Sequence, residues 1–224
     1  MSSPFQVFQI DQDSPNHDQL AAKYRELRLN ALKQSPTSFA STFEVEEKYS
    51  IEYWSSKLFH PNKKTFICID KGSSATAALE ESQWVAQVTL LGPIPADSFR
   101  LPEESGQPPV LSDEEEERWQ MLGLFSLPSH RGKGLAKLIC RTAYDYLTSF
   151  EQGAPKVVLR IMVKPENTVT LNMYSSMGFA DAGKCTLEEA LRANGETDHI
   201  PENPSEKFKT RSGIIMQLPL QRQR

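Results

Sequence analysis

The chain has little cysteine and no long apolar run. Its three cysteines among 224 residues are an odd number, and their spacing fits no metal-binding pattern. No apolar run approaches the roughly twenty residues that cross a bilayer, and the first ten residues lack the basic start and apolar core of a leader sequence. We therefore expect no membrane association, no metal, and a reduced compartment, the cytoplasm or the nucleus.

A surplus of basic residues is also missing. Lysine and arginine number 25 against 29 aspartates and glutamates, a net charge of −4. Nucleic acid requires a basic surface for its phosphates, so we expect no nucleic-acid partner. The 38% hydrophobic content is enough to bury one substantial core over this length, which predicts a single domain spanning residues 1–224.

Two segments of this domain have few candidate core residues. An acidic, proline-containing insertion covers residues 97–118, and a polar excursion covers residues 184–212. The acidic run has two interpretations: a solvated, mobile loop kept open by its own charge, or an acidic rim that attracts a cationic amine.

The remaining sequence alternates between helical and strand-like patterns. The spacing predicts helices over 18–33, 44–58 and from 135 to 150, and strands over 5–10, 64–70, 83–91, 119–127, 156–164 and 213–218. One face of the third helix is expected to hold Leu135, Leu138, Ile139, Thr142, Tyr146 and Phe150. The nearly continuous apolar runs at 119–127 and 157–163 are typical of central strands covered on both faces.

Residues 129–136, Ser-His-Arg-Gly-Lys-Gly-Leu-Ala, lie between the strand at 119–127 and the third helix. Gly132 and Gly134 remove side-chain walls, so consecutive backbone N–H groups can converge on a phosphate at the positive end of the helix. Arg131 and Lys133 add positive charge. The glycines match neither a nucleotide-triphosphate loop nor a dinucleotide fingerprint, which indicates a different phosphate-bearing cofactor.

A second motif follows the strand at 156–164. Asn167 is suited to cap a short helix, and Gly178 suits the left-handed position that ends one. Tyr174 then lies about two turns into this helix.

Together these motifs resemble the Gcn5-related N-acetyltransferase family, GNAT. Residues Arg131, Gly132, Lys133, Gly134, Leu135 and Ala136 match the family's pyrophosphate loop, and Asn167 through Tyr174 to Phe179 match its later motif. The resemblance implies an α/β (α+β) fold. Its sheet is mixed and largely antiparallel, is flanked by helices, and has two splayed parallel strands at its centre.

The resemblance also implies a site for acetyl-CoA. The pantetheine arm is expected to pair with the backbone of Leu124, Phe125 and Ser126, as an added strand would. A backbone N–H near Phe125 or Ser126 is expected to stabilise the oxyanion, and Tyr174 to act as general acid for the leaving thiolate. Asn167 is expected to serve as helix cap, cofactor contact, or both.

The general base is where the sequence departs from better-known members. Many of them place a carboxylate on the fourth strand, but here the corresponding residues are Gln120, Leu122 and Leu124. A primary ammonium has a pKa near 10, so some group must accept its proton at neutral pH. The alternatives are Glu117, at the start of the strand, and an ordered water held by backbone carbonyls.

The resemblance therefore predicts an enzyme that transfers acetyl from acetyl-CoA to a primary amine, by direct attack in a ternary complex. The acceptor is a small-molecule amine or a peptide, and the protein a monomer or homodimer. The alternative is a non-catalytic acetyl-CoA-binding sensor or partner module, which the missing strand carboxylate favours and Tyr174 opposes.

Overall fold

A computed structural model describes residues 3–36, 38–39, 41–73, 78–149 and 153–222. Its strands are β1 (Phe5–Gln9), β2 (Lys63–Asp70), β3 (Trp84–Leu91), β4 (Glu116–Ser126), β5 (Lys156–Val163), β6 (Ala180–Cys185) and β7 (Gly213–Gln221). Its α-helices are α1 (His17–Gln34), α2 (Phe43–Glu46), α3 (Ile51–Leu58), α4 (Ala96–Phe99), α5 (Leu135–Thr148), α6 (Thr168–Ser175), α7 (Leu187–Ala193) and α8 (Glu206–Lys209).

The strands form one mixed sheet in the order β1-β2-β3-β4-β5-β7-β6. Strand β1 is antiparallel to β2, and β7 is antiparallel to both β5 and β6. Strands β4 and β5 are parallel. The predicted fold, a largely antiparallel sheet with a parallel pair at its centre and helices around it, is confirmed.

The parallel pair is shorter than the strands that form it. Pairing joins Glu116–Gln120 of β4 to Lys156–Arg160 of β5, yet β4 continues to Ser126 and β5 to Val163. Within the unpaired part of β4, Gly123 has a φ of +67°, in the left-handed region that favours glycine. The strand therefore changes its course between its paired half and its last residues.

The chain forms two compact units. The first contains residues 1–90 and 123–143, and the second contains residues 91–122 and 144–224. Strand β4 contributes residues to each unit, with the division immediately before Gly123. The expectation of a single domain stays a prediction.

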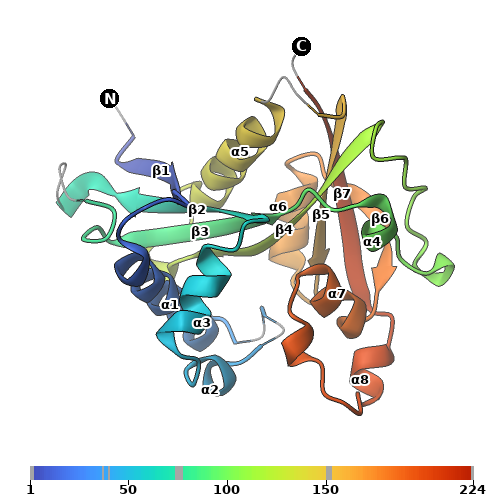
Figure 1. Cartoon of the computed structure of the whole chain (residues 1–224), viewed down its shortest axis with the longest axis horizontal. Coiled ribbons are helices and arrows are strands. Elements are labelled where there is room, and N and C mark those ends of the chain that lie inside the picture. Colours follow the sequence, from blue (N-terminus) through green and yellow to red (C-terminus); the bar gives the residue numbers. More distant parts are fainter. Residues whose placement is uncertain (1–2, 37, 40, 74–77, 150–152, 223–224) are drawn as a thin grey trace. The chain divides into compact units, whose positions relative to one another are not determined.

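The core of the first unit lies between helices α1 and α3 and the strands beside them (Figure 1). Leu20, Leu27 and Ala31 of α1 pack with Leu58 of α3, and the cluster includes residues of β2, β3 and β4. With the partly buried Tyr24, these residues of α1 follow steps of three and four, and the predicted helix at 18–33 is confirmed.

A buried ion pair joins α1 to α2 within this unit. Arg28 donates from Nε and Nη2 to the two carboxylate oxygens of Glu46, over 2.9 and 2.6 Å. The side chains are 10% and 5% exposed. The Arg28 guanidinium also lies 4.6 Å from the ring centroid of Phe39. This planar, bidentate pairing fixes the position of α2, the next helix in the chain, against α1.

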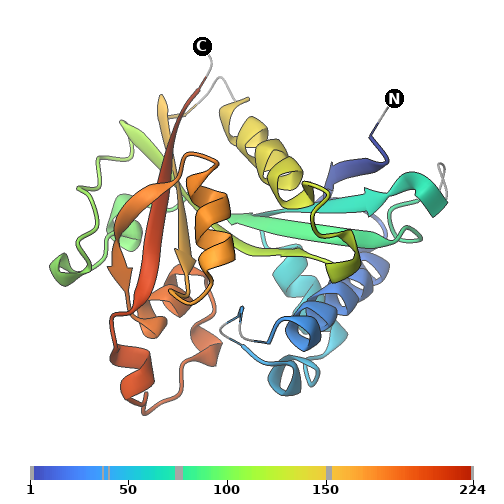
Figure 2. The same ribbon diagram turned by 180° about the vertical axis from the view of Figure 1, so that it is seen from behind.

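In the second unit, strands β5, β7 and β6 lie side by side and α6 covers one of their faces (Figure 2). Burial of Val157, Leu159 and Ile161 on β5 confirms the predicted central strand. Strand β7 pairs with the whole length of β5. The predicted strand at 213–218 is therefore correct and extends three residues further.

The predicted helix over 44–58 is wrong as one element. The structure has two short helices, α2 and α3, and Ser50 lies between them. The Ser50 side chain accepts a hydrogen bond from the Tyr53 backbone N–H and so starts α3. Serine in this position satisfies an N–H that a continuous helix would bond to the preceding turn, which explains the interruption.

The predicted face of the helix after residue 134 is partly wrong. Its most buried residues are Leu135, Ile139, Cys140, Ala143 and Leu147, whereas Leu138 is 36% exposed. The buried stripe thus follows steps of four residues from Leu135. Phe150, the last predicted member, lies outside the described residues.

The acidic insertion is held by defined contacts, unlike the freely solvated loop of the first interpretation. Its last three residues already belong to β4, which begins at Glu116. Arg118, fully buried, donates to the backbone oxygens of Ile94, Leu111 and Ser112 and pairs with Asp113. The guanidinium fork therefore ties the insertion to the start of the strand.

The polar excursion contains regular secondary structure that its polar composition does not predict. Its first two residues complete β6, and Thr186 starts α7 through a capping box with Glu189. Arg211 then donates to both oxygens of Glu189, over 2.6 and 2.8 Å. One carboxylate thus fixes both ends of the excursion.

The last described residues of the chain are held by contacts within the second unit. Gln221 belongs to β7, and Arg222 is 9% exposed and donates to the Ala154 carbonyl and to Glu117. Cys68, Cys140 and Cys185 are buried and form no disulfide. In the described part of the chain, no helix has the length and apolarity needed to cross a membrane.

The buried pair of α1 and α2 predicts a large effect of Arg28→Met. The substitution leaves the Glu46 carboxylate buried without its partner, so the free energy of unfolding should fall by about 3 kcal/mol. Urea denaturation followed by circular dichroism measures this change. Lys23→Met, also on α1, is the control and should change stability by less than about 0.5 kcal/mol; equal effects of the two substitutions would contradict the role of the pair.

Candidate functional site

The predicted phosphate loop is open and shaped by its two glycines. Residues 131–134 are exposed, and α5 begins directly after them at Leu135, which is buried, with Ala136 half-buried. Gly132 and Gly134 have φ values of +76° and +78°. A Cβ at either position would meet no atom within 4 Å, so the backbone conformation and not crowding requires glycine.

The loop presents unused backbone donors at the start of α5. The Arg131 N–H donates to the Pro128 carbonyl, but in the described part of the chain the N–H groups of Gly132, Lys133 and Gly134 donate no hydrogen bond. The first turn of an α-helix adds further free N–H groups and a partial positive charge. Such free donors at a positive helix end can bind a phosphate group.

Arg131 folds back from the loop toward the rest of the first unit. Its Nε donates to the Ser126 carbonyl over 3.3 Å, and its Nη2 donates to Ser35 Oγ over 2.9 Å. Its Cζ lies 5.9 Å from the ring centroid of Phe125. The side chain therefore joins the loop to the end of β4 and to the end of α1, a function that the sequence did not predict.

The expected pantetheine strand lies at the end of β4. Leu124 and Ser126 are half-buried, and Phe125 is buried in the core of the first unit. These residues follow Gly123, whose carbonyl accepts a hydrogen bond of 3.4 Å from Gln87 Nε2. The pairing of β4 with β5 ends shortly before Gly123. An isolated glycine within an apolar strand is typical of such an irregularity, so Gly123 was a sequence signal from which this feature could have been predicted.

Asn167 and Tyr174 lie on the second unit. Asn167 caps α6, because its side-chain oxygen accepts a hydrogen bond from the Thr170 N–H over 3.3 Å, as predicted. Tyr174 lies two turns further, is 4% exposed, and packs edge-on against Phe179 with ring centroids 5.1 Å apart. Gly178 has a φ of +96°, which confirms the predicted left-handed residue after the helix.

Glu117 is already engaged in contacts of its own. Its Oε1 accepts hydrogen bonds from Arg222 over 2.6 Å and from the Trp119 ring N–H over 2.7 Å. The Arg222 side chain is 3% exposed, so this carboxylate compensates a buried charge. Of the two alternatives for the proton acceptor, these contacts favour the ordered water.

Gln120, one of the three β4 residues at which the resemblance leads us to look for a carboxylate, belongs to a buried polar network. Its Oε1 accepts from Arg160 over 2.8 Å, and its Nε2 donates to Asn194 over 3.1 Å. Arg160 also donates to the Phe99 carbonyl over 2.7 Å and stacks on the Phe99 ring. Burial lowers the pKa of Arg160 to about 10, because the charged form loses its hydration.

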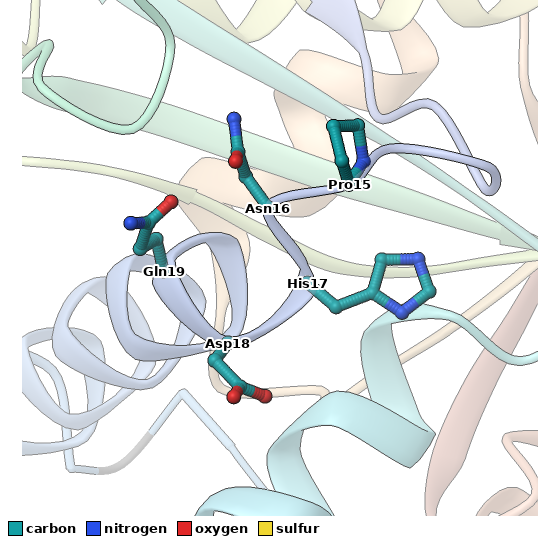
Figure 3. A pocket seen from close by; sticks show the side chains of 5 residues that line it. All are labelled: Pro15, Asn16, His17, Asp18 and Gln19. Carbon is teal, nitrogen blue, oxygen red and sulfur yellow. The ribbon is translucent and has the colours of Figure 1, made fainter.

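A shallow hollow elsewhere contains none of the predicted site residues. It is lined by Pro15, Asn16, His17, Asp18 and Gln19, whose side chains point in different directions at the start of α1 (Figure 3). The His17 ring stacks on Phe59 with centroids 3.6 Å apart, so it has a packing function. Among the described residues, no three His, Cys, Asp or Glu side chains gather as metal ligands.

Comparison with known families identifies the class of this fold and loop. The model of the acetyltransferase (GNAT) family matches residues 37–179, more than half of the chain, and includes both sequence motifs. The chain belongs to the GNAT family of acetyltransferases. No curated protein sequence matches it significantly.

Solved structures share the fold at low sequence identity. One is Arabidopsis thaliana NAA60 in complex with acetyl-CoA, with a TM-score of 0.55 and 14% identity over 96% of this chain and 98% of that chain. The ribosomal-protein-S18-alanine N-acetyltransferase of Escherichia coli has a TM-score of 0.50 and 15% identity, covering 98% and 96%. A mutant form of the spermidine/spermine N-acetyltransferase SpeG from Vibrio cholerae has a TM-score of 0.50 and 14% identity, covering 97% and 95%.

The Gln120 network predicts that two substitutions at this position differ in their effect on stability. Gln120→Leu leaves Arg160 Nε buried without its acceptor and should lower the free energy of unfolding by about 2 kcal/mol. Gln120→Glu keeps an acceptor and adds a counter-charge, so its stability should stay within about 1 kcal/mol of the wild type. Denaturant unfolding measures both. If Gln120→Glu is as unstable as Gln120→Leu, the amide does not serve Arg160 in this way.

Proposed function

We propose that this protein is an N-acetyltransferase that uses acetyl-CoA and acetylates a primary amine by direct attack in a ternary complex. The observation that carries the proposal is the loop at 131–134, with two left-handed glycines and three unused N–H groups before α5. Its match to the family's pyrophosphate loop selects the cofactor, and acetyl-CoA is bound in the solved structure of NAA60.

The residues of the first unit bind and orient in this proposal. The N–H groups of Gly132, Lys133 and Gly134 hold the pyrophosphate, supported by the N-terminus of α5 and the charge of Lys133. The backbone of Leu124, Phe125 and Ser126 pairs with the pantetheine arm as an added strand. A backbone N–H near Phe125 or Ser126 stabilises the negative charge that develops on the acetyl oxygen.

The residues of the second unit manage protons. Acetyl-CoA supplies an activated acetyl thioester, and Tyr174 donates its phenolic proton to the leaving sulfur. Burial of Tyr174 beside Phe179 limits the rotamers of the ring, which suits a positioned acid. The amine passes its proton through an ordered water to the solvent, because the Glu117 carboxylate is paired with Arg222 and the Gln120 amide is not a base.

The acceptor in this proposal is a small-molecule amine or the amine of a peptide. The spermidine/spermine and ribosomal-protein-S18-alanine N-acetyltransferases share the fold and represent these two kinds of acceptor by name. A reduced compartment suits three buried cysteines that form no disulfide.

Titration with acetyl-CoA in a calorimeter tests the proposal first. We expect saturable binding of one equivalent, and then amine-dependent thiol release with one member of a panel of polyamines, amino sugars, amino acids and peptides. Binding without release from any amine would support the non-catalytic binding module. No binding would overturn the assignment of the loop.

Tyr174→Phe tests the general acid. The substitution keeps the ring against Phe179 but removes the phenolic proton, so kcat should fall about 100-fold while the Kd for acetyl-CoA stays unchanged. Tyr146→Phe removes a hydroxyl from α5 and is the matched control, with kcat within about two-fold of the wild type. Wild-type turnover by Tyr174→Phe would show that another group protonates the thiolate.

A further inference from the structure

Ser35, at the end of α1, contacts the guanidinium of Arg131 although the two residues are 96 positions apart. It is the C-cap residue of α1, and its N–H donates to the Ala31 carbonyl over 2.9 Å. That bond fixes the backbone of Ser35 to the helix. Its hydroxyl oxygen accepts the hydrogen bond from Arg131 Nη2 over 2.9 Å, so an acceptor at the end of α1 reaches the arginine.

The same arginine is fixed at a second point by the end of β4. Its Nε donates to the Ser126 carbonyl, and its charge lies over the Phe125 ring. With Ser35 on one side and Ser126 on the other, the guanidinium plane has two acceptors in different elements. A planar fork with two acceptors has less rotational freedom than an arginine without side-chain partners, although Arg131 is exposed.

The segment after Ser35 is anchored to the same strand. The ring centroid of Phe39 lies 6.3 Å from that of Phe125. The Phe39 ring also contacts the guanidinium of Arg28, which pairs with Glu46 of α2. A chain of contacts thus runs from the loop through Arg131 and Phe125 to Phe39 and α2. All of these residues belong to the first unit.

We propose that Ser35 is a positioning residue for the cofactor loop: it holds Arg131, and through Arg131 it sets the loop in the conformation that binds acetyl-CoA. Through its contact with Phe125, and from there through Phe39, the arginine also couples the loop to α2. This inference rests on the proposed function. Ser35 itself touches neither the loop glycines nor a reacting atom, so its effect passes through the arginine.

Calorimetric titration of four variants with acetyl-CoA tests this proposal. Ser35→Ala should raise the Kd about five-fold, because one of two acceptors of the guanidinium is lost. Ser35→Thr retains the hydroxyl and should stay within two-fold of the wild type. Ser38→Ala, which removes an exposed hydroxyl three residues further on, is the matched control and should bind as the wild type does. Arg131→Met should bind more weakly than Ser35→Ala.

The double variant Ser35→Ala with Arg131→Met separates positioning from a general structural effect. If Ser35 acts only through Arg131, adding Ser35→Ala to Arg131→Met should change the Kd less than two-fold. A further five-fold loss in this background would overturn the proposal. So would equal binding by Ser35→Ala and Ser38→Ala. Thermal unfolding without ligand should show the same midpoint for all the serine variants, within about 2 °C.

Amide hydrogen exchange provides a readout that a merely structural role would not move. Acetyl-CoA should slow exchange in α2, Phe43–Glu46, of the wild type and have a smaller effect in Ser35→Ala. An equal effect in both proteins would overturn the coupling of α2. If wild-type protein fails to bind acetyl-CoA in the calorimeter, the proposed function itself fails. Wild-type binding with an unchanged Ser35→Ala refutes only the role of Ser35.

Discussion

The short parallel pairing of β4 with β5 is the constraint on which the rest of the structure depends. It covers Glu116–Gln120 and Lys156–Arg160 and then ends, although both strands continue. Gly123 changes the course of β4 three residues later. The paired half of the strand lies in one compact unit and the last four residues in the other. A backbone released from its ladder at this point has donors and acceptors to offer a ligand.

Buried arginines connect the irregular segments to this sheet. Arg118 holds the acidic insertion, Arg160 joins β5 to Gln120 and Phe99, and Arg222 ties the end of the chain to Glu117. Backbone and amide oxygens are the main acceptors of Arg118 and Arg160, whereas Arg222 donates to one backbone carbonyl and one carboxylate. The charge of a buried guanidinium has to be solvated by such groups, so these segments are fixed to it. The acidic residues of β4 are thereby held in ion pairs with arginines. Proton transfer in the proposed reaction therefore depends on Tyr174 and water.

The sequence predicted the elements and site residues whose signals are local. Glycines at 132 and 134, the cap at Asn167 and the turn at Gly178 each follow from the backbone conformation that one residue allows, and the structure has all of them. It missed Ser50 as a helix start and β6 as a strand, because the residues of β6, Ala-Asp-Ala-Gly-Lys-Cys, have no alternating apolar pattern. Pairing with β7, a long-range interaction, makes that segment a strand.

By itself the sequence determined the family motifs, the central strands and the position of the phosphate loop, since each depends on residues close together in the chain. Only the tertiary structure decided which polar groups remain free. Glu117 accepts a hydrogen bond from Arg222, and Gln120 accepts one from Arg160. Arg131 donates to both Ser126 and Ser35. These partners lie 105, 40 and, for Ser35, 96 positions away, and no spacing rule connects residues so distant. A side chain's chemistry is set by its neighbours in space, and folding alone brings those neighbours together.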